Sequence, residues 1–217
     1  MAGWRTLPAM RWPWRRRNPP LDPWAELALE HGLNVQTPPE GESEDTPFHE
    51  RFGLAAGRVT HLAESDAAAT PQLRVALQTV PSDVRTRVAY RLHLIAERPD
   101  PLLPTAWRAR AAGHPLELQV QRNSSGGDVV RSGDDGFDAA VHVLSREAQA
   151  TAAALTPDVR DALAALFASG RPAGTLVAGG GLLRWTADEE VGPSDPRVGG
   201  LMDAFKGLAH LEVLKPA

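Results

Sequence analysis

A strict two-residue alternation over residues 84–94 constrains the fold of this chain more than any other feature. Successive side chains of a β-strand point to opposite faces of its sheet, so this period predicts a strand with one apolar and one basic face. The apolar row consists of Val84, Thr86, Val88, Tyr90, Leu92 and Leu94, and the other row of Arg85, Arg87, Ala89, Arg91 and His93. A similar alternation over residues 73–79 carries Arg74 on its polar side and predicts a neighbouring strand.

Three segments begin with a capping residue followed by proline, which is typical of a helix N-terminus. These are Asp22-Pro23, Thr156-Pro157 and Asp195-Pro196. Apolar residues then recur at helical spacing, which predicts helices over roughly 23–31, 157–168 and 196–213. The alanine-rich stretch 146–154 favours a further helix.

Further strands follow from alternation and from glycine-rich turns. They are predicted in a hairpin over 52–62, in 116–121, in 137–143, and in a hairpin of 175–178 with 182–185, whereas a short helix is expected near Trp107. Alternating strands that are adjacent in sequence favour an α+β fold, with a mainly antiparallel sheet and helices packed on one face. We expect a single domain over 22–217, or two lobes over 22–95 and 115–217.

The composition excludes several classes of protein. Among 217 residues there is no cysteine, which excludes disulfides and thiolate sites and favours a reducing cytoplasm. Mean hydropathy is −0.27, and we find no apolar run long enough for a transmembrane helix. The net charge of −4 is unlike that of a dedicated duplex-DNA binder.

Residues 1–21 form a basic tail rich in tryptophan and proline. Its prolines exclude a long helix, and no apolar run follows the arginines as a secretory or twin-arginine signal would require. We expect a disordered extension, or residues upstream of a start at Met10. The alternative is an anchor to a partner or to the inner face of an anionic membrane, through Trp12, Trp14, Arg15, Arg16 and Arg17.

No motif predicts a catalytic site, a metal site or a cofactor. The histidines lack metal-ligand spacing, and the glycine-rich stretches 124–128 and 178–182 lack the lysine of a phosphate loop. The acids of 38–47 predict a solvated loop, and those of 133–138 are better explained by a turn. An enzyme is therefore only an alternative, with a site assembled from distant residues: Arg91, Asp134, Asp138 and His142.

Three short motifs resemble those of a group of uncharacterised bacterial α+β proteins without an established activity. They are W-x-x-L-A with a following G-L over 24–33, G-D-x-x-F-D over 133–138 and L-T-P-x-V-R over 155–160. The resemblance would cover the chain from about residue 22 onward. It implies one α+β unit and no catalytic residues.

The basic row has an ordinary explanation as a solvated sheet surface that pairs with acids on neighbouring strands. Its functional interpretation is a surface for a protein partner, a second copy of the chain or another anionic ligand, formed by Arg74, Arg85, Arg87, Arg91 and His93. Nucleic-acid binding is a further alternative, but the row lacks the aromatic rings on which bases stack. We therefore expect a non-enzymatic protein-interaction or anionic-surface-binding module.

Overall fold

The computed structural model describes residues 22–39, 47–55, 57–80, 89–100, 106–113 and 127–211. Its centre is one nine-stranded sheet with the order β1-β2-β3-β4-β9-β8-β5-β7-β6, and every neighbouring pair is antiparallel. The strands are β1 (Asn34–Gln36), β2 (Arg58–Glu64), β3 (Gln72–Val80), β4 (Ala89–Glu97), β5 (Trp107–Ala111), β6 (Asp128–Val130), β7 (Val141–Ser145), β8 (Gly174–Gly179) and β9 (Leu182–Ala187). The α+β class and the antiparallel sheet are confirmed.

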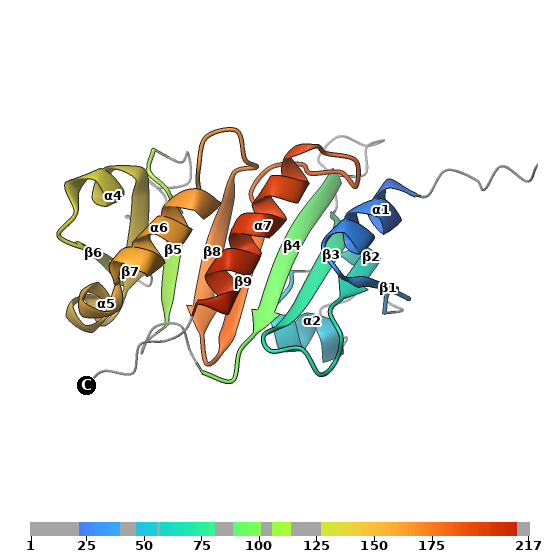
Figure 1. The fold of residues 1–217 in the computed structure, drawn as a ribbon, viewed down its shortest axis with the longest axis horizontal. Coiled ribbons are helices and arrows are strands. Elements are labelled where there is room, and N and C mark those ends of the chain that lie inside the picture. Colours follow the sequence, from blue (N-terminus) through green and yellow to red (C-terminus); the bar gives the residue numbers. More distant parts are fainter. Residues whose placement is uncertain are drawn as a thin grey trace, which may run out of the picture.

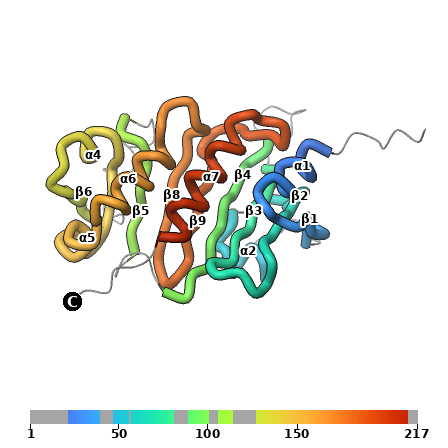
Figure 2. Tube along the Cα trace, in the orientation of Figure 1, coloured from blue at the N-terminus to red at the C-terminus, as the bar shows by residue number. Residues whose placement is uncertain are grey.

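Most helices lie on one side of this sheet (Figures 1 and 2), which we call the helix face. The helices are α1 (Pro23–Glu30), α2 (Pro47–Phe52), α4 (Asp135–Ala140), α5 (Ala148–Ala154), α6 (Pro157–Leu166) and α7 (Arg197–His210). Helix α7 crosses the middle of the sheet, with α1 and α6 on either side of it (Figure 1). The short helix α2 lies behind the sheet in this view, on the opposite face.

The main core lies between the helix face and α1, α6 and α7. Alternate residues of the central strands point into it and are almost fully buried: Leu77, Leu92, Leu94, Leu176, Leu183 and Trp185. They pack with Leu163 of α6 and with Leu201 and Leu208 of α7. Burial of each such side chain contributes roughly 1.5–3 kcal/mol, so the period-two pattern favours the face of these central strands that packs against the helices.

The capping residues act as the sequence predicts at the start of α1 and α6. The Asp22 carboxylate accepts a hydrogen bond from Trp24 N at 3.4 Å, and the Thr156 hydroxyl accepts one from Val159 N at 3.4 Å. Asp195 precedes α7 and its Oδ1 accepts a hydrogen bond from Arg197 N at 2.9 Å. Each bond satisfies an N–H group that has no partner inside its helix.

Helix α2 covers a second, smaller core on the opposite face. Its members are Phe52, Leu54, Val59, Leu62, Ala76 and Ile95. Because α2 brings apolar side chains to the polar side of β2, β3 and β4, both faces are buried at this end of the sheet. In this part of β2, β3 and β4, side chains on both faces of the sheet are therefore buried.

Three predicted elements are wrong. Residues 52–62 form no hairpin, because α2 ends at Phe52 and β2 begins at Arg58. Residues 137–140 belong to helix α4, whose N-cap Asp134 accepts a hydrogen bond from Phe137 N at 3.0 Å, and β7 starts only at Val141. Trp107 begins strand β5 instead of a short helix.

The hairpin of β8 and β9, the last in the sequence, lies in the middle of the sheet. Its strand β9 pairs with β4, and β8 pairs with β5. This hairpin therefore joins the strands that precede residue 98 to those that follow residue 106. The predicted tail over 1–21, the acidic residues 40–46, and residues 84–88 and 116–121 lie outside the described residues.

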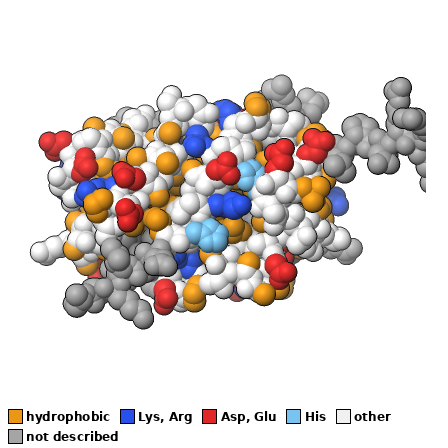
Figure 3. Space-filling model, viewed as in Figure 1, with side chains coloured by type: hydrophobic (Ala, Val, Ile, Leu, Met, Phe, Trp, Pro, Cys, Tyr) orange, Lys and Arg blue, Asp and Glu red, His pale blue; other side chains and the backbone are white. Residues whose placement is uncertain are grey.

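The helix-covered side has no dominant surface character. Figure 3 shows acidic, basic and apolar side chains interspersed over the described part of this face. No helix among the described residues is long and apolar enough to cross a membrane.

Candidate functional site: the polar face of the sheet

The side of the sheet opposite α1, α6 and α7 is called the polar face. On this face, one row of side chains crosses the strands β4, β9, β8, β5 and β7. The strand register places each residue of the row directly opposite a residue of the neighbouring strand. In order, the row consists of His93, Thr186, Thr175, Arg110 and His142. Directly opposite residues in antiparallel strands have Cβ atoms about 5 Å apart, so neighbours in the row can interact.

His93 is the centre of a buried network at one end of this row. Its Nε2 lies 3.1 Å from Gln78 Oε1, and its Nδ1 lies 3.2 Å from Thr186 Oγ1. The Gln78 amide nitrogen donates to Ala55 O at 2.6 Å, so Gln78 Oε1 must act as the acceptor. The imidazole therefore carries its proton on Nε2, and Thr186 donates to Nδ1.

Burial keeps His93 uncharged. Burial, followed by the positive charges of Arg184, Arg91 and His49, lowers the pKa of His93 to about 3. The side chain is only 3% exposed. His93 thus connects β3, β4 and β9 as a neutral residue, and the expectation that it lies on a solvated surface is corrected.

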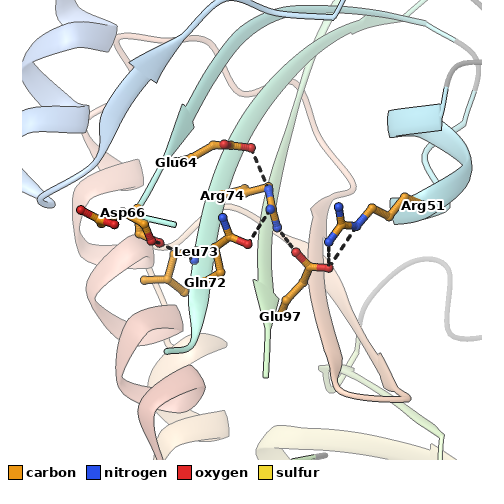
Figure 4. A network of polar contacts seen from close by, with 8 residues as sticks. Arg51, Glu64, Asp66, Gln72, Leu73, Arg74 and Glu97 are labelled. Atoms are coloured by element: carbon orange, nitrogen blue, oxygen red, sulfur yellow. Dashed lines mark hydrogen bonds and ion pairs between the residues drawn. The ribbon is translucent and has the colours of Figure 1, made fainter. Parts of the chain in front are cut away.

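Arg74 lies on the polar face beneath α2, where it joins several elements (Figure 4). Its Nε donates to Glu64 Oε1 at 2.7 Å, its Nη2 donates to Gln72 Oε1 at 2.7 Å, and its Nη1 donates to Glu97. The guanidinium carbon also stacks 4.9 Å from the centre of the Phe52 ring. With 7% of its side chain exposed, Arg74 is a buried structural cation and does not belong to a solvated row.

Glu97 receives a second arginine from α2. Arg51 Nη2 lies 2.6 Å from Glu97 Oε1, so this carboxylate bridges Arg51 and Arg74. Burial raises the pKa of Glu97, but the hydrogen bonds from the two arginines outweigh it, and the pKa lies below its ordinary value. Glu97 thereby links α2 to the C-terminal end of β4.

The rest of the polar face carries a second set of arginines, which we call the arginine group: Arg91, Arg108, Arg110 and Arg184. Arg184 and Arg108 lie in a common cross-strand row, separated by Val177. Burial and the nearby charge of Arg108 lower the pKa of Arg184. Among the described residues no carboxylate forms an ion pair with any of the four.

The members of the arginine group differ in their surroundings. Arg184 donates to the backbone oxygens of Phe52 and Gly53 at the end of α2, whereas its Nε is buried without a partner. Arg108 is exposed and Arg91 half-buried. Arg110 is 5% exposed, and its Nε and Nη1 have no hydrogen-bond partner. The polar face therefore holds four arginines that form no ion pair with a described carboxylate.

The sequence-predicted binding residues are only partly brought together. Of this set, Arg91 belongs to the arginine group, Arg74 and His93 are buried in networks, and Arg85 and Arg87 lie outside the described residues. The tail residues of the second predicted set also lie outside them: Trp12, Trp14, Arg15, Arg16 and Arg17.

The sequence patterns do not single out Arg108, Arg110 and Arg184. The alternation Trp107-Arg108-Ala109-Arg110-Ala111 contains the strand signal, but it is short and follows a proline-rich stretch. Arg184 stands in a recognised hairpin, yet nothing local shows that this hairpin lies beside β4. Only the strand order places these arginines on one surface.

The residues of the enzyme alternative do not converge. Asp134 caps α4 and its Oδ2 lies 3.7 Å from Arg160 Nε, while the carboxylate of Asp138 accepts a hydrogen bond from Ser132 N at 3.1 Å. His142 lies on β7, four strand positions from Arg91 on β4, which corresponds to roughly 19 Å. Two of the four residues thus support α4, and the other two are far apart.

The searched part of the chain contains no group of three histidine, aspartate or glutamate side chains able to hold a metal ion. Comparison of the chain with family models, with curated proteins and with solved structures finds no match.

Proposed function

We propose that this chain is a non-enzymatic binding module whose arginine group docks an acidic segment of a protein partner. The observation that carries the proposal is the contrast between two sets of arginines on one sheet face. Arg74 is neutralised by Glu64 and Glu97, whereas the arginine group forms no ion pair with a described carboxylate. Uncompensated arginines on one surface attract acidic partners and raise their association rates.

The character of the surface favours a protein over a nucleic acid. Single-stranded nucleic acids bind where exposed aromatic rings stack their bases between basic residues. The tryptophans of the described strands, Trp107 and Trp185, are buried in the core of the helix face. The polar face instead places Val177 between Arg184 and Arg108, and Leu144 beside Arg108, as expected for contact with a mixed acidic and apolar peptide.

Fluorescence anisotropy with a labelled oligoglutamate peptide tests this proposal. The protein is expected to bind the peptide at low salt, and binding should weaken as salt rises. The double variant Arg91→Gln, Arg108→Gln should bind roughly tenfold more weakly, because two exposed ion pairs at about 0.7 kcal/mol each are lost. The matched control Arg58→Gln, Arg146→Gln removes the same charge from exposed positions elsewhere and should bind like the parent chain.

Two results would overturn the proposal. One is the absence of peptide binding at low salt. The other is tighter binding of a labelled single-stranded oligonucleotide than of the peptide at the same ionic strength, with the same loss in the Arg91→Gln, Arg108→Gln variant. That second result would assign the arginine group to a nucleic acid.

A further inference from the structure

Arg110 is the most unusual side chain of the polar face. It is 5% exposed, its Nε and Nη1 lack any hydrogen-bond partner, and no ion pair joins it to another residue within the described part of the chain. Two buried guanidinium N–H groups without acceptors cost free energy, because they have lost their hydration and formed no hydrogen bond in return. Sites of this kind persist where a ligand supplies the missing acceptor.

The residues next to Arg110 in the cross-strand row determine which side chains there can donate a hydrogen bond. Register places Thr175 directly opposite it on β8 and His142 opposite it on β7. The Thr175 hydroxyl already donates its proton to Asp188 Oδ2 at 2.8 Å, so it has no further proton to donate. The Nε–H and Nη1–H groups of Arg110 are therefore unpartnered donors in this stretch of the row, and exposed Arg108 lies about 7 Å away along the same strand.

A comparison within the same face shows what is missing. Arg74 is equally buried, but it forms ion pairs with Glu64 and Glu97 and is stacked on Phe52. Arg110 has the same burial and none of these partners. The described residues thus supply carboxylates for one buried arginine of the polar face and no ion-pair partner for the other.

We infer that Arg110 anchors a binding site for a carboxylate ion. A carboxylate oxygen accepts a short, charge-assisted hydrogen bond from a guanidinium N–H, and a single negative charge neutralises a single buried cation. A phosphate dianion would leave an excess negative charge near the Asp188 carboxylate, which accepts the Thr175 proton. The carboxylate comes either from a free small acid or from an acidic side chain of a docked partner, and only the second source rests on the proposed function.

Removal of Arg110 provides the first test. Because the side chain carries an uncompensated buried charge, the Arg110→Met variant in chloride buffer should have a melting temperature equal to or above that of the parent chain. A melting temperature lowered by more than about 5 °C would show that the chain itself neutralises Arg110, and would overturn the inference.

Ligand-dependent stability provides the second test, with sodium acetate as the probe against sodium chloride at equal ionic strength. At an acetate concentration ten times its Kd, the melting temperature of the parent chain should rise by about 3 °C. Arg110→Met and Arg110→Lys should lose this rise, and the control Arg146→Met should keep it. A rise that persists in Arg110→Lys would contradict a site built on the guanidinium, and a larger rise in phosphate would contradict the choice of carboxylate.

A third measurement needs no stable variant. In a ¹H–¹⁵N spectrum of the parent chain, the Nε–H resonance of Arg110 should shift progressively and saturate as acetate is added. An unchanged resonance, with the other arginine signals equally unchanged, would sink the inference.

The two proposals can fail separately. If acetate acts through Arg110 but the oligoglutamate peptide does not bind, the carboxylate comes from a free acid, and the docking function is wrong. If the peptide binds through Arg91 and Arg108 while acetate has no effect on the Arg110 resonance, the docking function stands and the carboxylate site is wrong.

Discussion

Arg74 of β3 and Glu97 of β4 form an ion pair inside the molecule, beneath the short helix α2. The pair is extended by Glu64 on one side and by Arg51 of α2 on the other (Figure 4). A helix of six residues, Pro47–Phe52, has little stability of its own. Its place on the polar face therefore depends on this network and on the packing of Phe52.

We predict that Arg74→Ala lowers the free energy of unfolding by about 3 kcal/mol, because it leaves partly buried Glu64 without its cation and Glu97 with Arg51 alone. Urea denaturation followed by tryptophan fluorescence measures the change. Arg58→Ala is the control, since Arg58 is an exposed arginine on the adjacent strand β2 and its loss should cost under about 1 kcal/mol. Equal costs for the two variants would show that the network contributes nothing.

The low pKa of His93 predicts that the free energy of unfolding depends on pH. Its pKa is about 3 in the folded chain, against an ordinary value of 6.5. Between these two values the unfolded chain binds a proton that the folded chain excludes, so the free energy of unfolding falls as pH decreases, by about 1.4 kcal/mol per pH unit. Above pH 6.5 the contribution of His93 is constant.

The measurement is a series of urea denaturation curves between pH 7 and pH 4. His93→Gln should have a shallower dependence than the parent chain over this interval. His210→Gln, at an exposed position of α7, should keep the parental slope. If His93→Gln and the parent chain have the same slope, His93 is not the neutral buried residue described above.

The contacts of Asp134 indicate a structural role for this acid of the 133–138 motif. It caps α4 by accepting the Phe137 N–H and lies 3.7 Å from Arg160 in the L-T-P-x-V-R motif. Asp134→Ala should lower the free energy of unfolding by about 1 kcal/mol, the usual cost of losing a helix cap. Asp135→Ala, at the next and exposed position, should have a smaller effect.

Thermal unfolding with and without magnesium completes this test. Neither the parent chain nor the two aspartate variants should gain stability from the ion. A magnesium-dependent rise in melting temperature that is lost in Asp134→Ala would contradict the capping role and restore these acids as a candidate cation site.

Local patterns predicted the elements whose stability depends on nearby residues. The Asp22 and Thr156 caps place α1 and α6, and alternation places β3, β8 and β9, because capping bonds and strand faces are set within a few residues. Local patterns failed at residues 137–140, where the apolar spacing fits a strand as well as the helix that the Asp134 cap selects. They also failed at Trp107, because five residues are too few for either period to be distinguished.

The candidate site depended on the strand order. Arg91 could be placed on a polar strand face from its sequence, but its neighbours Arg184 and Arg108 come from segments about 90 and 20 residues away, and their proximity requires β9, β8 and β5 to follow β4 in the sheet. The burial of Arg74 and His93 depended on α2, which covers their face although nothing in their own strands indicates a cover.

The sequence by itself determined which side of each strand is apolar, where the capped helices begin, and that the sheet is antiparallel, because these features follow from the spacing of side chains along the backbone. The tertiary structure alone decided which of the arginines are neutralised and which are not. Charge compensation depends on distances between residues that are remote in sequence, and the strand order together with the position of α2 sets those distances.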